Sequence, residues 1–122
     1  MSNNFLKSSR QEIKLQLTPL AEQVYETIPA RVNAPCFIVS PGSPYVEEGE
    51  TFTDFAVRFE VVALAGVATN EVISEELDTL IINALDALDT WGIEAVDTPS
   101  QFEINGANYL GTRINVVAEK TL

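Results

Sequence analysis

The stretch TFTDFAVRFEVVAL, residues 51–64, carries the clearest strand pattern in the chain. The apolar side chains of Phe55, Val57, Phe59 and Val61 alternate with the mixed set Ala56, Arg58, Glu60 and Val62. Alternation with a period of two puts one set on each face of a β-strand. We therefore predict a long strand over residues 51–64 with one apolar face and one mixed face, ended by Gly66.

A helix is predicted directly after this strand, over residues 70–91. Its apolar residues recur every three or four positions, at Ile73, Leu77, Leu80, Ile81, Ala84, Leu88 and Trp91. Thr69 and Asn70 supply an N-cap, Glu71 adds an acid to the first turn, and Gly92 is placed to end the helix. The polar face carries Glu75, Glu76, Asp78, Asp86 and Asp89. This pattern predicts one long helix packed on a sheet.

The end of the chain reads as a β-hairpin around Asn105-Gly106, a strong signal for a two-residue turn. Such a turn pairs residues 104 with 107 and 102 with 109. Leu110, Ile114 and Val116 then fall on the face opposite to Tyr109. Either both faces of this strand are covered, or a bulge at Gly111 resets the alternation, and we favour the bulge.

The first half of the chain adds a helix and two strands. We expect a flexible N-terminus over residues 1–9, a helix from residue 10 that Pro19 interrupts, and a short strand over 24–28. Residues 36–39 are uniformly apolar, which indicates a strand covered on both faces. The proline, glycine and glutamate content of residues 40–51 predicts a loop.

The resulting order is α-β-β-β-α-β-β. It predicts a single α+β domain over residues 10–122, with a mostly antiparallel sheet and the long helix packed on it. A chain of 122 residues is the usual size of one domain. No apolar run approaches the ~20 residues needed to cross a bilayer, and the N-terminus lacks a signal-peptide pattern.

Charge excludes a nucleic-acid-binding role. The chain has 18 acidic and 7 basic residues and no histidine, for a net charge of −11. Nucleic-acid affinity depends on Lys and Arg, and the bases form no cluster along the sequence. They are Lys7, Arg10, Lys14, Arg31, Arg58, Arg113 and Lys120. An acidic surface can nevertheless line a path along which DNA slides without binding.

No residue pattern in the chain supports an enzyme or a cofactor. Cys36 is the only cysteine, and without a histidine it has neither a general base nor zinc-ligand partners. It heads an apolar strand, so we interpret it as a small buried side chain. The loop after it has no lysine for a phosphate site, and no calcium-loop sequence occurs. Acids on one helix face are more simply a solvated surface than a catalytic pair.

The loop over residues 40–51 has two interpretations. It is either a plain connection or an acidic arm, with Tyr45 and Val46 at its tip, that reaches a neighbouring subunit. The candidate interface residues are Tyr45, Val46, Glu47, Glu48, Glu50 and Phe52. The alternative for the apolar members is that they cap the core of their own subunit.

The chain resembles the tail terminator (tail completion) proteins of long, non-contractile-tailed bacteriophages, the group of the lambda minor tail protein U. In the first half of the chain, the stretches that resemble this family are VYETIP (24–29), PCFIV (35–39) followed by Pro41, and TDFAVRFEV (53–61). The helix over 70–91 and GANYLG (106–111) match the second half of that family. The resemblance covers residues 10–118 and is one of pattern, because the family has no catalytic or ligand motif.

The resemblance implies a structural virion protein, assembled in the host cytoplasm. Such proteins form a ring, expected to have six members, on the head-proximal end of the tail tube. The ring ends polymerisation of the major tail protein and meets the head connector, and DNA crosses its lumen. The acids of the arm or of the helix would then lie in the lumen or between subunits. Alternatives are another neck protein, such as a head-completion or stopper protein, and a small ligand-binding regulatory domain.

Overall fold

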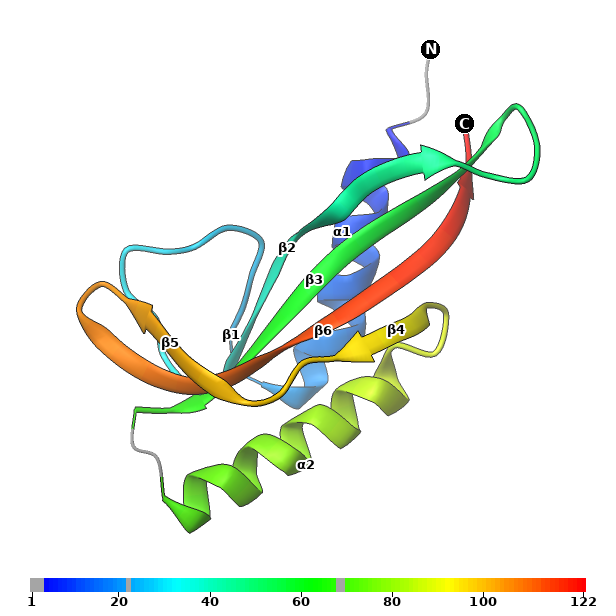
Figure 1. The fold of residues 1–122 in the computed structure, drawn as a ribbon. Helices are drawn as coiled ribbons and strands as arrows, with labels where there is room; N and C mark the ends of the chain where they lie inside the picture. Colours follow the sequence, from blue (N-terminus) through cyan, green and yellow to red (C-terminus); the bar gives the residue numbers. More distant parts are fainter. Residues whose placement is uncertain (1–3, 22, 68–69) are drawn as a thin grey trace.

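The computed structural model describes residues 4–21, 23–67 and 70–122 as an α+β fold with two α-helices and a six-stranded mixed sheet (Figure 1). The helices are α1 (Phe5–Leu17) and α2 (Glu71–Ala87), and a 3₁₀ turn (Thr18–Leu20) follows α1. The strands are β1 (Gln23–Tyr25), β2 (Cys36–Glu48), β3 (Asp54–Gly66), β4 (Gly92–Val96), β5 (Ser100–Ile104) and β6 (Ala107–Thr121). The sheet runs in the order β1-β2-β3-β6-β4, and β5 pairs with the first part of β6.

The α+β class and the mostly antiparallel sheet are confirmed, because only the β1–β2 pair is parallel among the described strands. The order differs by one additional strand, β4, which pairs with β6. The sequence pattern missed β4 because most of its residues are exposed, so it has no apolar alternation.

The central strand β3 forms as the alternation predicts. Val57, Phe59, Val61 and Ala63 are all fully buried on the face that both helices cover. Ile13 and Leu17 of α1 and Leu77, Leu80 and Ala84 of α2 join the same cluster. The main core therefore lies between one face of the sheet and the two helices.

A second apolar cluster covers the other face at one end of the sheet. It contains Val32, Cys36, Ile38, Val62, Leu64 and Tyr109. The segment between β1 and β2 folds over this face, where the Asn105 side-chain amide donates to the carbonyls of Pro29 and Ala30. The prediction that residues 36–39 are covered on both faces is confirmed.

The β5–β6 hairpin has the predicted turn and register. Asn105 and Gly106 both have positive φ, at 52° and 84°, and Ile104 pairs with Ala107 and Phe102 with Tyr109. The favoured bulge at Gly111 is wrong, because β6 runs through Gly111 without an inserted residue and both of its faces are covered there, by the clusters that contain Leu110 and Tyr109. The register shift lies in the facing strand, between Leu64 and Gly66.

Helix α1 begins at Phe5, five residues before the predicted start, and ends at Leu17 before Pro19 as expected. The Asn4 side chain accepts a hydrogen bond from the Lys7 backbone amide and caps the first turn. Strand β1 ends at Tyr25, so the predicted strand over 24–28 is too long.

Helix α2 is shorter than predicted and stops at Ala87. Asn70 is its N-cap and accepts from the Ile73 amide, whereas Thr69 lies outside the described residues. Gly92 is the first residue of β4, so its predicted role as the helix end is wrong. The chain leaves the helix early because Trp91 turns back into the core, 5.7 Å edge-on from Phe59.

The predicted loop over residues 40–51 is wrong, because β2 continues through it to Glu48. Pairing with β3 continues from Ser40↔Glu60 to Glu48↔Phe55, with a register shift between Pro41 and Val46. β1 covers the outer edge of β2 only as far as Ile38. Pro41 and Pro44 thus lie where β2 is an edge strand, and an edge strand tolerates prolines.

Candidate assembly surface

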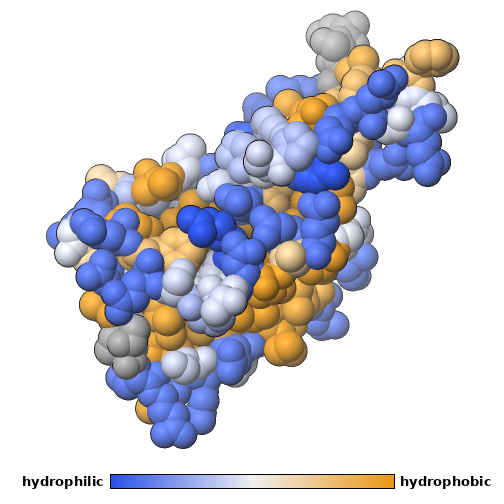
Figure 2. Space-filling model, viewed as in Figure 1, coloured by the Kyte–Doolittle hydropathy of each residue, from blue (hydrophilic) through white to orange (hydrophobic). Residues whose placement is uncertain are grey.

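The β2–β3 hairpin forms an arm, residues 45–56, that projects at one end of the molecule (Figures 1 and 2). The N-terminal part of α1 packs against it, with 5.9 Å between the ring centroids of Phe5 and Phe55. Its turn is closed by hydrogen bonds from the Gly49 amide to the Asp54 carbonyl (2.8 Å) and from the Asp54 amide to the Thr51 carbonyl (3.2 Å). The last residues of β6 pair along β3 in the arm, as in Asp54↔Thr121. Three strands therefore support the arm.

Asp54 fixes the base of this turn. Its carboxylate accepts a hydrogen bond of 2.7 Å from the Thr121 hydroxyl. This hydrogen bond, together with a second from Thr51, lowers the pKa of Asp54 below its ordinary value because both stabilise the charged form.

Tyr45 lies at the base of the arm, so its predicted place at the tip is wrong. Its ring packs edge-on against Phe59, with 5.5 Å between ring centroids. Its hydroxyl accepts a hydrogen bond of 3.1 Å from Arg10 in α1. Tyr45 therefore caps the core of its own subunit, as the alternative interpretation had it.

The tip of the arm carries Phe52, whose side chain is 95% exposed. Val46 is also exposed, at 37%, and lies between the base and the tip. A phenyl ring left almost wholly in water is unusual for a residue type that normally anchors cores and interfaces. Of the predicted apolar interface residues, Phe52 is thus the strongest candidate.

The three glutamates of the arm have different surroundings. Glu47 forms an ion pair with Arg58, whose Nη1 lies 2.6 Å from the Glu47 Oε1. Glu48 and Glu50 are exposed and belong to no ion pair among the described residues. The backbone amide of Glu50 donates to Glu119 (3.3 Å). Glu48 and Glu50 are therefore the acids available to a partner.

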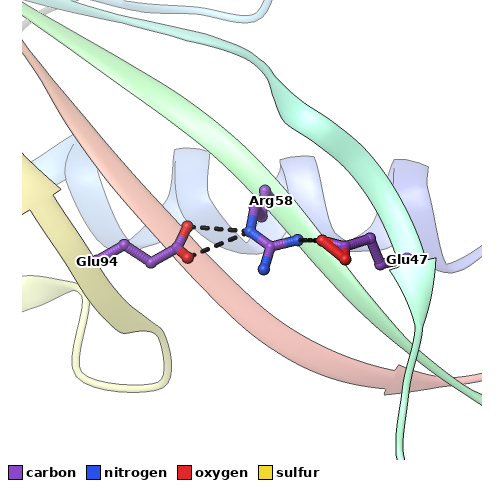
Figure 3. Close-up of polar contacts among 3 residues, drawn as sticks. All are labelled: Glu47, Arg58 and Glu94. Carbon is purple, nitrogen blue, oxygen red and sulfur yellow. Dashed lines mark hydrogen bonds and ion pairs between the residues drawn. The ribbon is translucent and has the colours of Figure 1, made fainter.

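Arg58 ties the arm to the opposite edge of the sheet (Figure 3). Its Nε donates to both carboxylate oxygens of Glu94 on β4, at 3.1 and 3.2 Å, while Nη1 donates to Glu47 on β2. Hydrogen bonding to Glu94, followed by the charges of Glu94 and Glu47, raises the pKa of Arg58 above its ordinary value. The bridge crosses the sheet face opposite the helices and orients the arm.

The acidic face of α2 lies apart from the arm (Figure 1). Glu75, Glu76, Asp78 and Asp86 are exposed on α2, as predicted. Asp89 is also exposed, but its predicted place on the helix is wrong, because it lies in the turn after α2 ends at Ala87. Two of them, Glu75 and Glu76, border a groove that is also lined by Leu20, Pro35, Val72 and Leu80. The structure therefore presents two separate acidic surfaces.

The prediction that the Lys and Arg residues form no cluster is wrong for α1. Lys7, Arg10 and Lys14 follow helical spacing, and Lys7 and Arg10 line one groove with Tyr45. Lys14 lines the adjoining groove with Leu15. Applying the helical period to charged residues as well as apolar ones would have detected this face.

Cys36 is fully buried, and burial raises the pKa of its thiol to about 11. Its interpretation as a buried structural side chain is confirmed. Among the described residues, no group of three His, Cys, Asp or Glu side chains is placed to hold a metal ion. Neither described helix is long and apolar enough to span a membrane.

No protein-family model matches this chain, and no curated protein matches it.

Proposed function

We propose that this chain is a structural subunit of a phage virion, a tail terminator that caps the head-proximal end of the tail tube as a ring of six copies. The ring ends addition of the major tail protein and forms the joint to the head connector. The sequence resemblance supplies the identity of the assembly. The structural observation that carries the proposal is the arm, because a firmly held hairpin ends in the exposed ring of Phe52.

The arm has the form of a contact element. Exposed aromatic residues on a rigid support are the side chains that anchor protein–protein interfaces, since their burial removes a large apolar area from water. The hydrogen bonds of Asp54 and the ion pairs of Arg58 already hold the arm in place, so the arm loses little conformational entropy when it binds a partner. The arm therefore suits repeated, identical contacts between subunits.

The charge of the chain suits a ring through which DNA passes. A net charge of −11 on each copy repels phosphates, so DNA can slide through the lumen without being retained. The exposed acids of α2 are the candidates for this lining, and the arm acids for subunit contacts. Reversing the charge of the α2 acids is expected to slow DNA passage, and unchanged infectivity would contradict this assignment.

Deletion of the gene from its phage or prophage tests the proposal, with particles viewed by negative-stain microscopy. We expect tails of uncontrolled length and heads without tails, and rescue by the wild-type gene. Tails of normal length that do not join heads would instead identify a neck protein on the head side. Intact particles would refute an assembly role and favour ligand binding in the groove beside α2.

A further inference from the structure

The basic face of α1 forms no ion pair among the described residues, although Arg10 donates a hydrogen bond to the Tyr45 hydroxyl. It consists of Lys7, Arg10 and Lys14, three of the seven bases in the chain, with Gln11 and Leu15 on the same side of the helix. The ion pairs among the described residues use Arg58, Arg113 and Lys120, and none includes the three bases of α1. Three bases without a carboxylate partner are notable in a chain with 18 acids.

The surface of this face is partly apolar. Leu15 is 73% exposed, and it borders the same groove as Lys14 and Gln11. Leu6 and Tyr45 line the neighbouring groove with Lys7 and Arg10. Glu26 is the acid that also lines both grooves. The face thus offers cations around an exposed aliphatic side chain.

The arm tip carries the complementary set of groups, with Glu48 and Glu50 beside the exposed Phe52. The tip cannot swing onto the basic face of its own α1, because the strands of the arm are paired as far as Glu48↔Phe55 and Asp54↔Thr121. Its tip extends past the N-terminal end of α1 (Figure 1). The basic face of another molecule can therefore receive the tip.

We propose that the arm of one copy docks on the basic face of α1 in the next copy, with Phe52 against Leu15 and with Glu48 and Glu50 beside Lys7 and Lys14. This inference rests on the proposed function, since it names the contact that builds the ring. Charge decides against the other apolar groove, beside α2, because Glu75 and Glu76 on its border repel the arm. Two different surfaces in one contact give head-to-tail association, the type that closes into a ring when the rotation between neighbouring copies permits.

Cysteine cross-linking of the purified full-length chain tests the contact directly. Cys36 is buried, so the native thiol does not compete. Under mild oxidation the variant Phe52→Cys/Leu15→Cys is expected to form a ladder of dimers, trimers and higher species. Each single variant gives dimers at most, because a head-to-tail contact needs both positions. The matched control Phe52→Cys/Val72→Cys places the second thiol in the α2 groove and should give no ladder.

Charge exchange supplies a second test, read as the association constant from light scattering or mass photometry. Reversing the charges on one side of the contact should weaken association by roughly tenfold or more, because two attractive pairs become repulsive. The two variants that do so are Lys7→Glu/Lys14→Glu and Glu48→Lys/Glu50→Lys. Combining all four substitutions should restore association to within about threefold of the wild-type value. Glu75→Lys/Glu76→Lys, with the same change of charge, should not weaken it.

A ladder through Val72, or wild-type association after both charge reversals, would overturn the docking while leaving the tail-terminator function in place. A wild-type chain that stays monomeric at high concentration, or a Phe52→Cys/Leu15→Cys variant that forms no ladder, would also overturn it. The function itself would be refuted separately, by normal tails and normal infectivity after gene deletion.

Discussion

Replacing Phe59 by alanine is expected to remove a large part of the stability of this fold. Phe59 is fully buried at the centre of β3, in the main core. Its ring meets Tyr45 at 5.5 Å and Trp91 at 5.7 Å, both edge-on. It therefore joins the base of the arm to the segment that follows α2.

The expected cost follows from these contacts. A buried Phe→Ala substitution costs about 3–5 kcal/mol, and each aromatic pair contributes about 0.5–1.5 kcal/mol beyond its buried area. With two such pairs, the loss should lie in the upper part of the range, about 4–5 kcal/mol. Small domains have about 5–15 kcal/mol in total, so the variant should melt roughly 15–20 °C lower.

Urea unfolding followed by far-ultraviolet circular dichroism measures this loss. The slope of the free energy of unfolding against urea concentration should be the same for the variant and the wild-type chain. The fluorescence of Trp91, the only tryptophan, reports on the same site. Phe52→Ala is the matched control, because the same chemical change at a 95% exposed side chain should cost less than about 0.5 kcal/mol. A loss below about 2 kcal/mol for Phe59→Ala, or an equal loss in the control, would refute the assigned packing.

Three further substitutions test other parts of the fold by the same unfolding assay. Gly111→Ala should cost at least about 2 kcal/mol, because the added Cβ would lie 2.5 Å from the Ala63 carbonyl oxygen and 2.6 Å from the Leu64 side chain; a neutral result would contradict this close strand approach. Asn70→Ala should cost about 1 kcal/mol through loss of the α2 N-cap, whereas Asn70→Ser should retain most of that stability. Burial raises the pKa of the Cys36 thiol from 9.0 to about 11, so the unfolded chain loses this proton at lower pH than the folded chain. Stability should therefore fall between about pH 9 and pH 11, by up to about 1.4 kcal/mol per pH unit, and Cys36→Ala should abolish this contribution.

Elements whose signal is local were predictable from the sequence. The alternation through Val57 and Phe59 fixes the buried face of β3, and the spacing of Leu77, Leu80 and Ala84 fixes that of α2. The turn at Asn105-Gly106 fixed the register of its hairpin, because positive φ at both positions admits few other conformations.

Elements that depend on distant contacts were not predictable in the same way. The composition of residues 40–48 indicates a loop, yet pairing with β3 makes them a strand. The end of α2 depends on Trp91 packing against Phe59, a contact that no helical pattern contains. The intrinsic preference of a residue for strand, helix or loop is weak compared with such tertiary contacts.

The candidate site shows the same limit. Composition identified residues 40–52 as an unusual acidic segment, but it could not separate Tyr45, which packs inward, from Phe52, which is exposed. That distinction depends on where the hairpin turns. The basic face of α1 could have been detected from the helical spacing of Lys7, Arg10 and Lys14.

The edge of β2 that carries Pro41 and Pro44 is protected against pairing with strands of other chains. Beyond Ile38 no described strand pairs with this edge, so its backbone groups could template strand after strand of other chains. Pro41 and Pro44 carry no amide hydrogen, and Glu48 adds charge near the end of the strand. Strand pairing along this part of β2 is thereby hindered, so a contact made at this edge has to use side chains.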